Sequence, residues 1–257
     1  MDVADLPPGY TEWPAPAALR EAVACLWSQV AVGDRSGLVL PDACTDLIWE
    51  QDRGAYVAGP DTGPVPITMA AGTVMIGVRF RPSAGGPALG VPLSELRDQR
   101  VDFADLRPAG ARQLPAGLGP PAAVARALAV TAALVDEAAP DPAVTMAARL
   151  LHDPRARAED VADDVGLSLR QLRRRCQAAV GYGPKTLQRV LRFRRFVSRI
   201  DALPQGPRSQ QSPRSPDGLD LAGLAVQAGY ADQAHLTREC GRLAGLTPAA
   251  LARQRAA

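Results

Sequence analysis

Hydrophobic and polar residues alternate along two stretches of the amino-terminal half. In residues 73–81, one face carries Val74, Ile76, Val78 and Phe80. In residues 44–50, one face carries Thr45, Leu47 and Trp49. A period of two predicts β-strands, and the Gly-, Pro- and Asp-rich segments beside them predict tight turns. A third strand is predicted near residues 22–32, although residues 17–26 fit a short helix equally well. We therefore expect residues 1–112 to form an antiparallel β-rich domain.

The apolar pattern changes to a helical period after residue 112. Two alanine- and leucine-rich stretches follow, and Pro140 and Pro142 separate them. Helical spacing interrupted by prolines predicts two helices. We interpret residues 113–152 as a helical connector between the β-rich domain and whatever follows.

The last hundred or so residues contain an internal repeat. With an offset of 64 positions, six of the sixteen residues from 172 to 187 recur as the same residue type. The matched pairs are Leu172 and Leu236, Arg174 and Arg238, Cys176 and Cys240, Gly181 and Gly245, Pro184 and Pro248, and Leu187 and Leu251. Just upstream the offset becomes 63 and pairs Gly166 with Gly229. A duplicated structural unit is the simplest explanation.

Each copy of the repeat has the pattern of two helices joined by a glycine turn. A short helix, residues 159–165 or 221–228, precedes a glycine that can adopt the left-handed conformation. Ser168 and Asp232 then stand where an N-cap is needed. Leucine and cysteine four residues apart give the next helix an inward face, as in a helix-turn-helix.

The outward faces of these second helices carry polar side chains suited to DNA. In the first copy they are Arg170, Gln171, Arg173, Arg174 and Arg175, and in the second Gln233, Thr237 and Arg238. The net charge of +2 divides unevenly: residues 1–149 hold 11 Arg and Lys against 17 Asp and Glu, whereas residues 150–257 hold 18 against 10. The basic half is therefore the predicted polyanion-binding part. Because Glu239 stands where the first copy has Arg175, we expect the first copy to contribute more phosphate affinity.

A long amphipathic helix is predicted between the copies, over residues 185–200. Its apolar stripe is broad, and Arg189, Arg192 and Arg199 fall on the other side. At about 1.5 Å per residue it would be roughly 24 Å long. Such a strut suits two reading units on successive major grooves, which recur about every 34 Å.

Residues 153–257 resemble the DNA-binding domain of AraC/XylS-family transcriptional regulators. The resemblance rests on "AGYADQAHLTRECGRLAGLTPAAL" in the second copy and "VGLSLRQLRRRCQAAVGYGPKTL" in the first. It implies an all-α domain with two helix-turn-helix units joined by a long helix, behind a sensing or dimerising domain. The base-reading positions that it implies are Arg170, Arg173, Arg174, Gln233, Thr237 and Arg238. The front half, with "LPDACTDLIWE" and "GVRFRP", is similar to a poorly characterised, at most distantly cupin-like domain of bacterial regulators.

Two features depart from this family. Cys176 and Cys240 occupy positions where the family generally has phenylalanine, so other side chains must fill the local packing. A proline- and serine-rich stretch, residues 203–218, stands where the family has a short turn. Such a composition predicts a flexible insert, which affects how firmly the two units are spaced.

The amino-terminal half offers little catalytic chemistry. The only histidines, His152 and His235, lie outside it, and Asp46 and Glu50 suit pairing with Arg79 or Arg81 better than general acid–base work. We expect no enzyme activity, no cofactor and no metal site, because Cys25 and Cys44 lack the further ligands that zinc needs. Candidate ligand contacts in this half are Trp49, Arg79 and Arg81.

Taken together, the sequence predicts an α+β protein that regulates transcription by binding a double-stranded operator, under the control of a small molecule or partner. RNA polymerase and a second copy of the chain are further candidate partners. The amino terminus lacks a secretion signal and no stretch is long enough to span a bilayer, so we expect a cytoplasmic, nucleoid-associated protein without membrane contact.

Two alternatives stay open at this point. The first is a DNA-repair alkyltransferase fused to the same type of DNA-binding domain, with an amino-terminal cysteine as alkyl acceptor. The second is a regulator whose amino-terminal domain is purely structural and takes no ligand.

Overall fold

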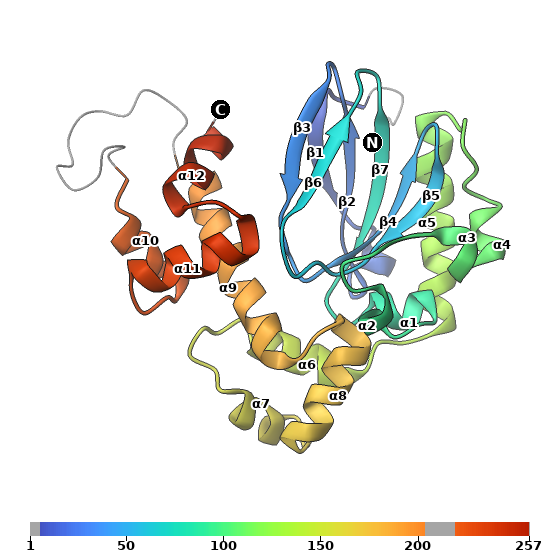
Figure 1. Ribbon diagram of the computed structural model, residues 1–257. Helices are drawn as coiled ribbons and strands as arrows, with labels where there is room; N and C mark the ends of the chain where they lie inside the picture. Colours follow the sequence, from blue (N-terminus) through green and yellow to red (C-terminus); the bar gives the residue numbers. More distant parts are fainter. Residues whose placement is uncertain (1–5, 204–218, 257) are drawn as a thin grey trace.

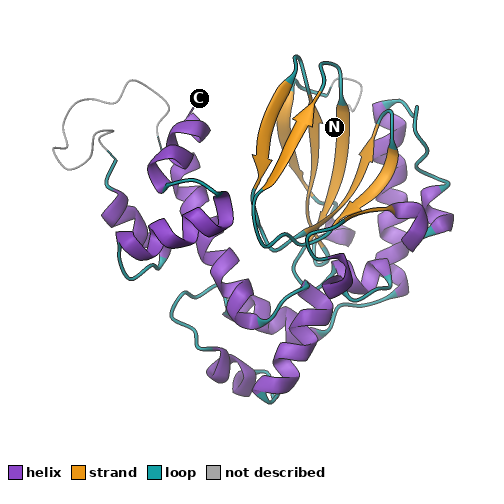
Figure 2. Ribbon diagram, in the orientation of Figure 1, coloured by secondary structure: helices purple, strands orange, loops and turns teal. Residues whose placement is uncertain are grey.

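The computed structural model describes residues 6–203 and 219–256. The fold is α+β, with an antiparallel sheet formed by the amino-terminal half and an all-helical carboxyl-terminal half (Figures 1 and 2). This confirms the predicted fold class. The predicted flexible insert falls almost wholly on residues 204–218, which lie outside the described residues.

Six strands form the main sheet, and two more form a separate hairpin. The strands are β1 (Gly9–Pro14), β2 (Val23–Val30), β3 (Arg35–Val39), β4 (Thr45–Glu50), β5 (Gly54–Ala58), β6 (Val65–Met69), β7 (Val74–Phe80) and β8 (Arg100–Asp102). The main sheet has the order β1-β2-β7-β4-β5-β8, and β3 pairs with β6. All pairings are antiparallel. The short helix considered before β2 is a single 3₁₀ turn, Ala17–Leu19.

The sheet has two unlike faces, as the alternation predicts. Ile76, Val78 and Phe80 join Leu47 and Trp49 in one hydrophobic core, which helix α5 (Pro120–Glu137) covers. The reverse face carries a smaller apolar cluster of Cys25, Trp27, Ile48, Tyr56 and Ala58. On that face the Trp27 indole lies directly over Gly77, where a Cβ would come within 2.0 Å of it.

Residues 85–111 are mostly helical, which differs from the strand-rich expectation for this region. Four short helices lie here: α1 (Gly85–Leu89), α2 (Leu93–Leu96), α3 (Phe103–Leu106) and α4 (Pro108–Ala111). Each has four or five residues. A helical period is visible only over a window of about 11 residues or more, so these turns leave no pattern to find.

The helices expected to form a connector divide between the two halves. Helix α5 packs against α1, β7 and β4, so it belongs to the amino-terminal core. Helix α6 (Pro142–Leu150) packs against α7 and α8, in the carboxyl-terminal core. Asp141 caps α6 by accepting a hydrogen bond of 2.9 Å from the amide of Ala143. The boundary between the domains therefore lies between these helices.

The carboxyl-terminal half contains six helices after α6 among the described residues. They are α7 (Ala158–Asp164), α8 (Leu169–Val180), α9 (Pro184–Asp201), α10 (Leu221–Ala228), α11 (Gln233–Ala244) and α12 (Pro248–Ala256). We name α7 with α8 the first unit, and α10 with α11 the second unit. Figure 1 shows α9 connecting the two units, and one continuous hydrophobic core includes residues from both units and from α9.

Candidate nucleic-acid interface

The first unit has the turn and cap that its sequence predicts. Gly166 adopts a left-handed conformation, with φ of 68°. The Ser168 hydroxyl accepts a hydrogen bond from the Gln171 amide at 3.2 Å. In return the Gln171 side-chain oxygen accepts one from the Ser168 amide at 2.9 Å. This reciprocal capping box fixes the first turn of α8, which carries Arg170 and Gln171, and Arg173 and Arg174 follow in the next turn.

The second unit repeats this construction with different residues. Gly229 is left-handed, with φ of 91°, and an Asp232 carboxylate oxygen accepts a hydrogen bond of 2.6 Å from the His235 amide. The His235 ring lies edge-on against Tyr230, with ring centroids 5.2 Å apart. Helices α8 and α11 have 12 residues each. The two units are therefore equivalent in structure as well as in sequence.

The side chains predicted to contact DNA are exposed, except Arg175, which is partly buried. Arg170, Gln171, Arg173 and Arg174 are exposed on α8, and Gln233, Thr237 and Arg238 on α11. Two of these side chains also make local contacts. The Gln171 oxygen belongs to the capping box, which leaves its amide hydrogens to donate, and the Thr237 hydroxyl donates to the Gln233 carbonyl at 2.9 Å.

The inward faces of α8 and α11 are fully buried. Leu172, Cys176, Leu236 and Cys240 have no exposed surface. These four side chains belong to one hydrophobic cluster with Phe193 and Phe196 from α9. The aromatic side chains of this cluster are those two phenylalanines with Tyr182 and Tyr230, and none comes from the two cysteine positions.

The comparison of Glu239 with Arg175, from which we expect more phosphate affinity in the first unit, requires the Glu239 side chain to be accessible to DNA. Glu239 is buried, and its carboxylate pairs with Arg189 of α9 at 2.9 Å and with Arg242 at 3.1 Å. The equivalent Arg175 pairs with Asp141, the cap of α6, at 3.2 Å. We call α8 and α11 the recognition helices. Each of these two ion pairs joins a recognition helix to a neighbouring helix. Glu239 therefore gives no measure of how the second unit attracts phosphate.

The arginines of α9 also have structural partners. Arg199 donates to the Gln227 side chain at 3.0 Å, and Arg195 donates to the Ala228 carbonyl at 2.8 Å. The Arg192 guanidinium lies over the Tyr230 ring, 5.6 Å from its centroid. All three contacts run from α9 to the second unit. The sequence suggests a basic outer face for this helix, whereas the structure uses that face to hold the second unit in place.

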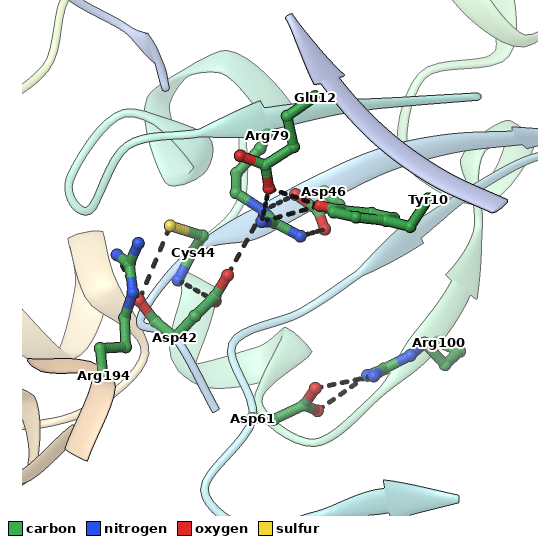
Figure 3. A network of polar contacts seen from close by, with 9 residues as sticks. All are labelled: Tyr10, Glu12, Asp42, Cys44, Asp46, Asp61, Arg79, Arg100 and Arg194. Atoms are coloured by element: carbon green, nitrogen blue, oxygen red, sulfur yellow. Dashed lines mark hydrogen bonds and ion pairs between the residues drawn. The ribbon is translucent and has the colours of Figure 1, made fainter. Parts of the chain in front are cut away.

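Arg79 is the centre of a polar cluster on the reverse face of the sheet (Figure 3). Its guanidinium makes two hydrogen bonds to the Asp46 carboxylate, at 3.0 and 3.1 Å. It also pairs with Glu12 at 3.2 Å and with Asp42 at 3.3 Å. Nearby acidic groups raise the pKa of Arg79, although burial acts against this, and burial raises the pKa of Asp46. The expected pairing of Asp46 with Arg79 is therefore present.

The other two candidate ligand contacts lie apart from this cluster. Trp49 is 1% exposed, and its indole nitrogen donates to the Pro115 carbonyl at 2.9 Å. Arg81 is exposed and donates to the Arg20 carbonyl at 2.8 Å. Trp49 faces the hydrophobic core, on the side of the sheet opposite to Arg79. The structure thus does not bring the three predicted residues together.

All four cysteines are free and buried. Burial raises the pKa of Cys25 to about 11, and it raises the pKa of Cys176 and of Cys240 to about 12. Burial also raises the pKa of Cys44 well above its ordinary value. Within the described residues, no group of three or more His, Cys, Asp or Glu side chains could hold a metal ion. A thiol held in its protonated form is a poor nucleophile.

Fold and interface together define a two-domain protein that joins an antiparallel β domain to a double helix-turn-helix. A comparison with protein families matches residues 11–102 to a domain of unknown function (DUF6597). A comparison with curated proteins finds no match. No described helix is both long and apolar enough to cross a membrane.

Among solved structures, two crystal structures of ToxT from Vibrio cholerae are similar. One, from strain O395, is 9% identical, covers 89% of this chain and 95% of its own, and has a TM-score of 0.44. The other is 8% identical, covers 95% of this chain and 98% of its own, and has a TM-score of 0.45. A likeness at this level is too weak to assign a family or a function.

Proposed function

We propose that this protein is a transcriptional regulator of the AraC/XylS type, which binds a specific duplex DNA site through both helix-turn-helix units. It acts on chromosomal DNA in the cytoplasm. A small molecule or a protein partner controls it through the amino-terminal domain. The sequence resemblance of residues 153–257 supports the same assignment.

One observation carries this proposal: the chain builds the same capped, exposed helix twice on one support. A single basic amphipathic helix is commonly just a solvated surface. Here each helix has a left-handed glycine before it and a side-chain cap, and each has a fully buried inner face. The outer faces carry Arg, Gln and Thr, which suit phosphates and base edges.

The support has a length appropriate for reading DNA. Helix α9 has 18 residues, which corresponds to about 27 Å at about 1.5 Å per residue. Helices α10 and α11 of the second unit pack against α9, as does α12, and α8 of the first unit contacts α9 as well. Units at the two ends of such a helix can reach successive major grooves, which recur about every 34 Å.

The experiment that tests the proposal begins with selection of duplexes from a random pool by the full chain. Arg174→Ala and Arg238→Ala, at equivalent positions of the two units, should each weaken binding to the selected duplex. A lost arginine–base contact costs about 1–3 kcal/mol. Arg112→Ala removes an exposed arginine from the amino-terminal domain and serves as the matched control, with unchanged affinity.

The salt dependence of binding separates phosphate contact from base contact. The wild-type affinity should fall steeply as salt increases, with a slope of about −0.9 per phosphate neutralised. A variant that loses a phosphate contact has a shallower slope. Recovery of no preferred sequence, or equal affinity of both variants and the control, would contradict the proposed function.

The contacts between the domains support control by the amino-terminal domain. The loop before β4 inserts Ala43 into the carboxyl-terminal core. Arg194 of α9 donates to the Asp42 carbonyl at 3.2 Å, and the Asp42 side chain in turn pairs with Arg79 on the sheet (Figure 3). A ligand that changes the Arg79 cluster would therefore act directly on the segment that contacts α9. Screening small molecules for a shift in the affinity for the selected duplex tests this part.

A further inference from the structure

One turn of the amino-terminal domain touches both helix-turn-helix units. We call residues 59–64, between β5 and β6, the proline turn. A Cβ built on Gly181, which ends α8, would lie 2.4 Å from Cγ of Pro60. A Cβ built on Gly245, which ends α11, would lie 3.6 Å from Cγ of Pro64. The two prolines at the ends of this turn thus lie beside the glycines that end α8 and α11.

The two contact points are the same position of the internal repeat. Gly181 and Gly245 are 64 residues apart, the offset of the duplication. Each is the left-handed residue that ends its recognition helix, with φ of 89° and 67°. The prolines at the ends of the turn therefore meet equivalent sites. Accidental packing of one domain on another has no reason to select such a pair.

The proline turn is held firmly by the amino-terminal domain. Asp61 makes two hydrogen bonds to Arg100 of β8, at 2.8 and 2.7 Å (Figure 3). The Thr62 amide donates to the Asp98 carboxylate at 2.7 Å. Gly59 lies so close to the Leu96 carbonyl that a Cβ would come within 1.8 Å of its oxygen. These contacts hold residues 59–62 of the turn against the sheet domain.

This arrangement fixes where the recognition helices end. Pro60 and Pro64 are four residues apart, so their Cα atoms are separated by at most about 14 Å. The carboxyl ends of α8 and α11 therefore converge on a short segment of the sheet domain. The opposite ends, which carry Arg170 and Gln233, point away from the turn. The predicted DNA-contacting residues are left free while the far ends of both helices are anchored.

The long helix by itself leaves the two units less well fixed. Helix α9 supports both units, because α8, α10 and α11 all pack against it, so bending or twisting of α9 would change their relative orientation. The proline turn adds a second connection between the two units, through the sheet domain, so that the units are joined both by α9 and by this turn.

We propose that the proline turn is the positioning element that sets the spacing between the two DNA half-sites read by the protein. The inference rests on the proposed function, and it concerns which spacing is accepted instead of which bases are read. Pro60 and Pro64 act as positioning residues, because they lie beside the carboxyl ends of α8 and α11 and not beside the DNA-facing residues.

The experiment measures affinity as a function of spacing. The duplex selected by the full-length wild type is lengthened one base pair at a time between its half-sites, through about half a helical turn, or ~5 base pairs. The wild type should bind best at one spacing and lose affinity on either side. The Pro64→Ala variant, and a second variant with two glycines inserted between Gly63 and Pro64, should bind about tenfold more weakly at that spacing, which corresponds to about 1.4 kcal/mol. Their loss at altered spacings should be smaller than that of the wild type.

Pro66→Ala is the matched control, because Pro66 is an exposed proline of β6 two residues beyond the turn. It should keep the wild-type spacing profile. The glycine insertion leaves the bonds between Asp61 and Arg100 in place, so it decides the question if Pro64→Ala lowers the unfolding temperature. Profiles of Pro64→Ala and of the insertion that match the wild type would overturn the inference while leaving the proposed function intact. If the wild type selects no duplex, both fail together.

Discussion

The two helix-turn-helix units share one core, so damage to the second unit should loosen the first. Leu236 of α11 has no exposed surface, and it lies in the same continuous cluster as Leu172 of α8 and Phe193 of α9. Buried Leu→Ala substitutions cost about 2.7–5.0 kcal/mol. We expect about 3–4 kcal/mol for Leu236→Ala, a large fraction of the total stability of about 5–15 kcal/mol typical of domains.

Hydrogen exchange followed by mass spectrometry measures this effect helix by helix. A factor of ten in an opening equilibrium corresponds to about 1.4 kcal/mol, so amides that open with the shared core should exchange roughly 150- to 700-fold faster in Leu236→Ala. The increase should appear in α8 and α9 as well as in α10 and α11, because a cooperative unit opens as a whole. Val226→Ala removes an exposed side chain from α10, 64% exposed, and should leave exchange unchanged.

The result that would refute this reasoning is specific. If Leu236→Ala speeds exchange in α10 and α11 while α8 keeps wild-type protection, the two units are separate cooperative structures. The two units would then touch each other in one core but open independently of each other. Equal effects of Leu236→Ala and Val226→Ala would instead show that burial of Leu236 contributes little.

Two further predictions concern the sheet domain and the cysteines. Gly77→Ala should lower the free energy of unfolding by about 1–3 kcal/mol in urea denaturation, because its Cβ would come within 2.0 Å of the Trp27 indole. Gly33→Ala is the control and should be neutral or slightly stabilising, because its Cβ would have nothing within 4 Å. The thiols of the native protein should react slowly with iodoacetamide at pH 8, because a pKa of about 11 for Cys25 leaves only about a thousandth of that thiol ionised. The rate should rise with pH toward that pKa, and the urea-unfolded chain should react fast at pH 8; fast labelling of Cys25 in the folded protein would contradict its burial.

The repeat made the carboxyl-terminal half predictable from sequence. Ser168 and Asp232 are caps because a helix start needs a side-chain acceptor, and Gly166 and Gly229 are left-handed because the turn requires it. These requirements are local, so each one selects residue types at neighbouring positions and can be recognised in the sequence. The strands β4 and β7 were predictable for a similar reason, since one buried face forces alternation.

Contacts between segments that are far apart in the chain produce no comparable local pattern in the sequence. The proline turn is an ordinary turn sequence, and nothing within it indicates that Pro60 and Pro64 meet the ends of two recognition helices. Arg189 has the spacing of a solvent-facing residue on α9, yet it pairs with Glu239 at 2.9 Å. Partners 50 residues apart in the chain become neighbours only when the helices pack, and periodicity within one helix carries no information about that packing.

Arg175 and Glu239 show why charge counts misjudge such an interface. They occupy equivalent positions of the repeat and carry opposite charges, yet each fastens its recognition helix to a support. The sign of the charge at each position is opposite to that of its partner, because Arg175 pairs with Asp141 and Glu239 pairs with Arg189. Several arginines that make the carboxyl-terminal half basic are thus used inside the protein. The phosphate contacts that determine the salt dependence of DNA binding must therefore be sought among the exposed side chains of α8 and α11, such as Arg170, Arg174 and Arg238, and not in the net charge of the domain.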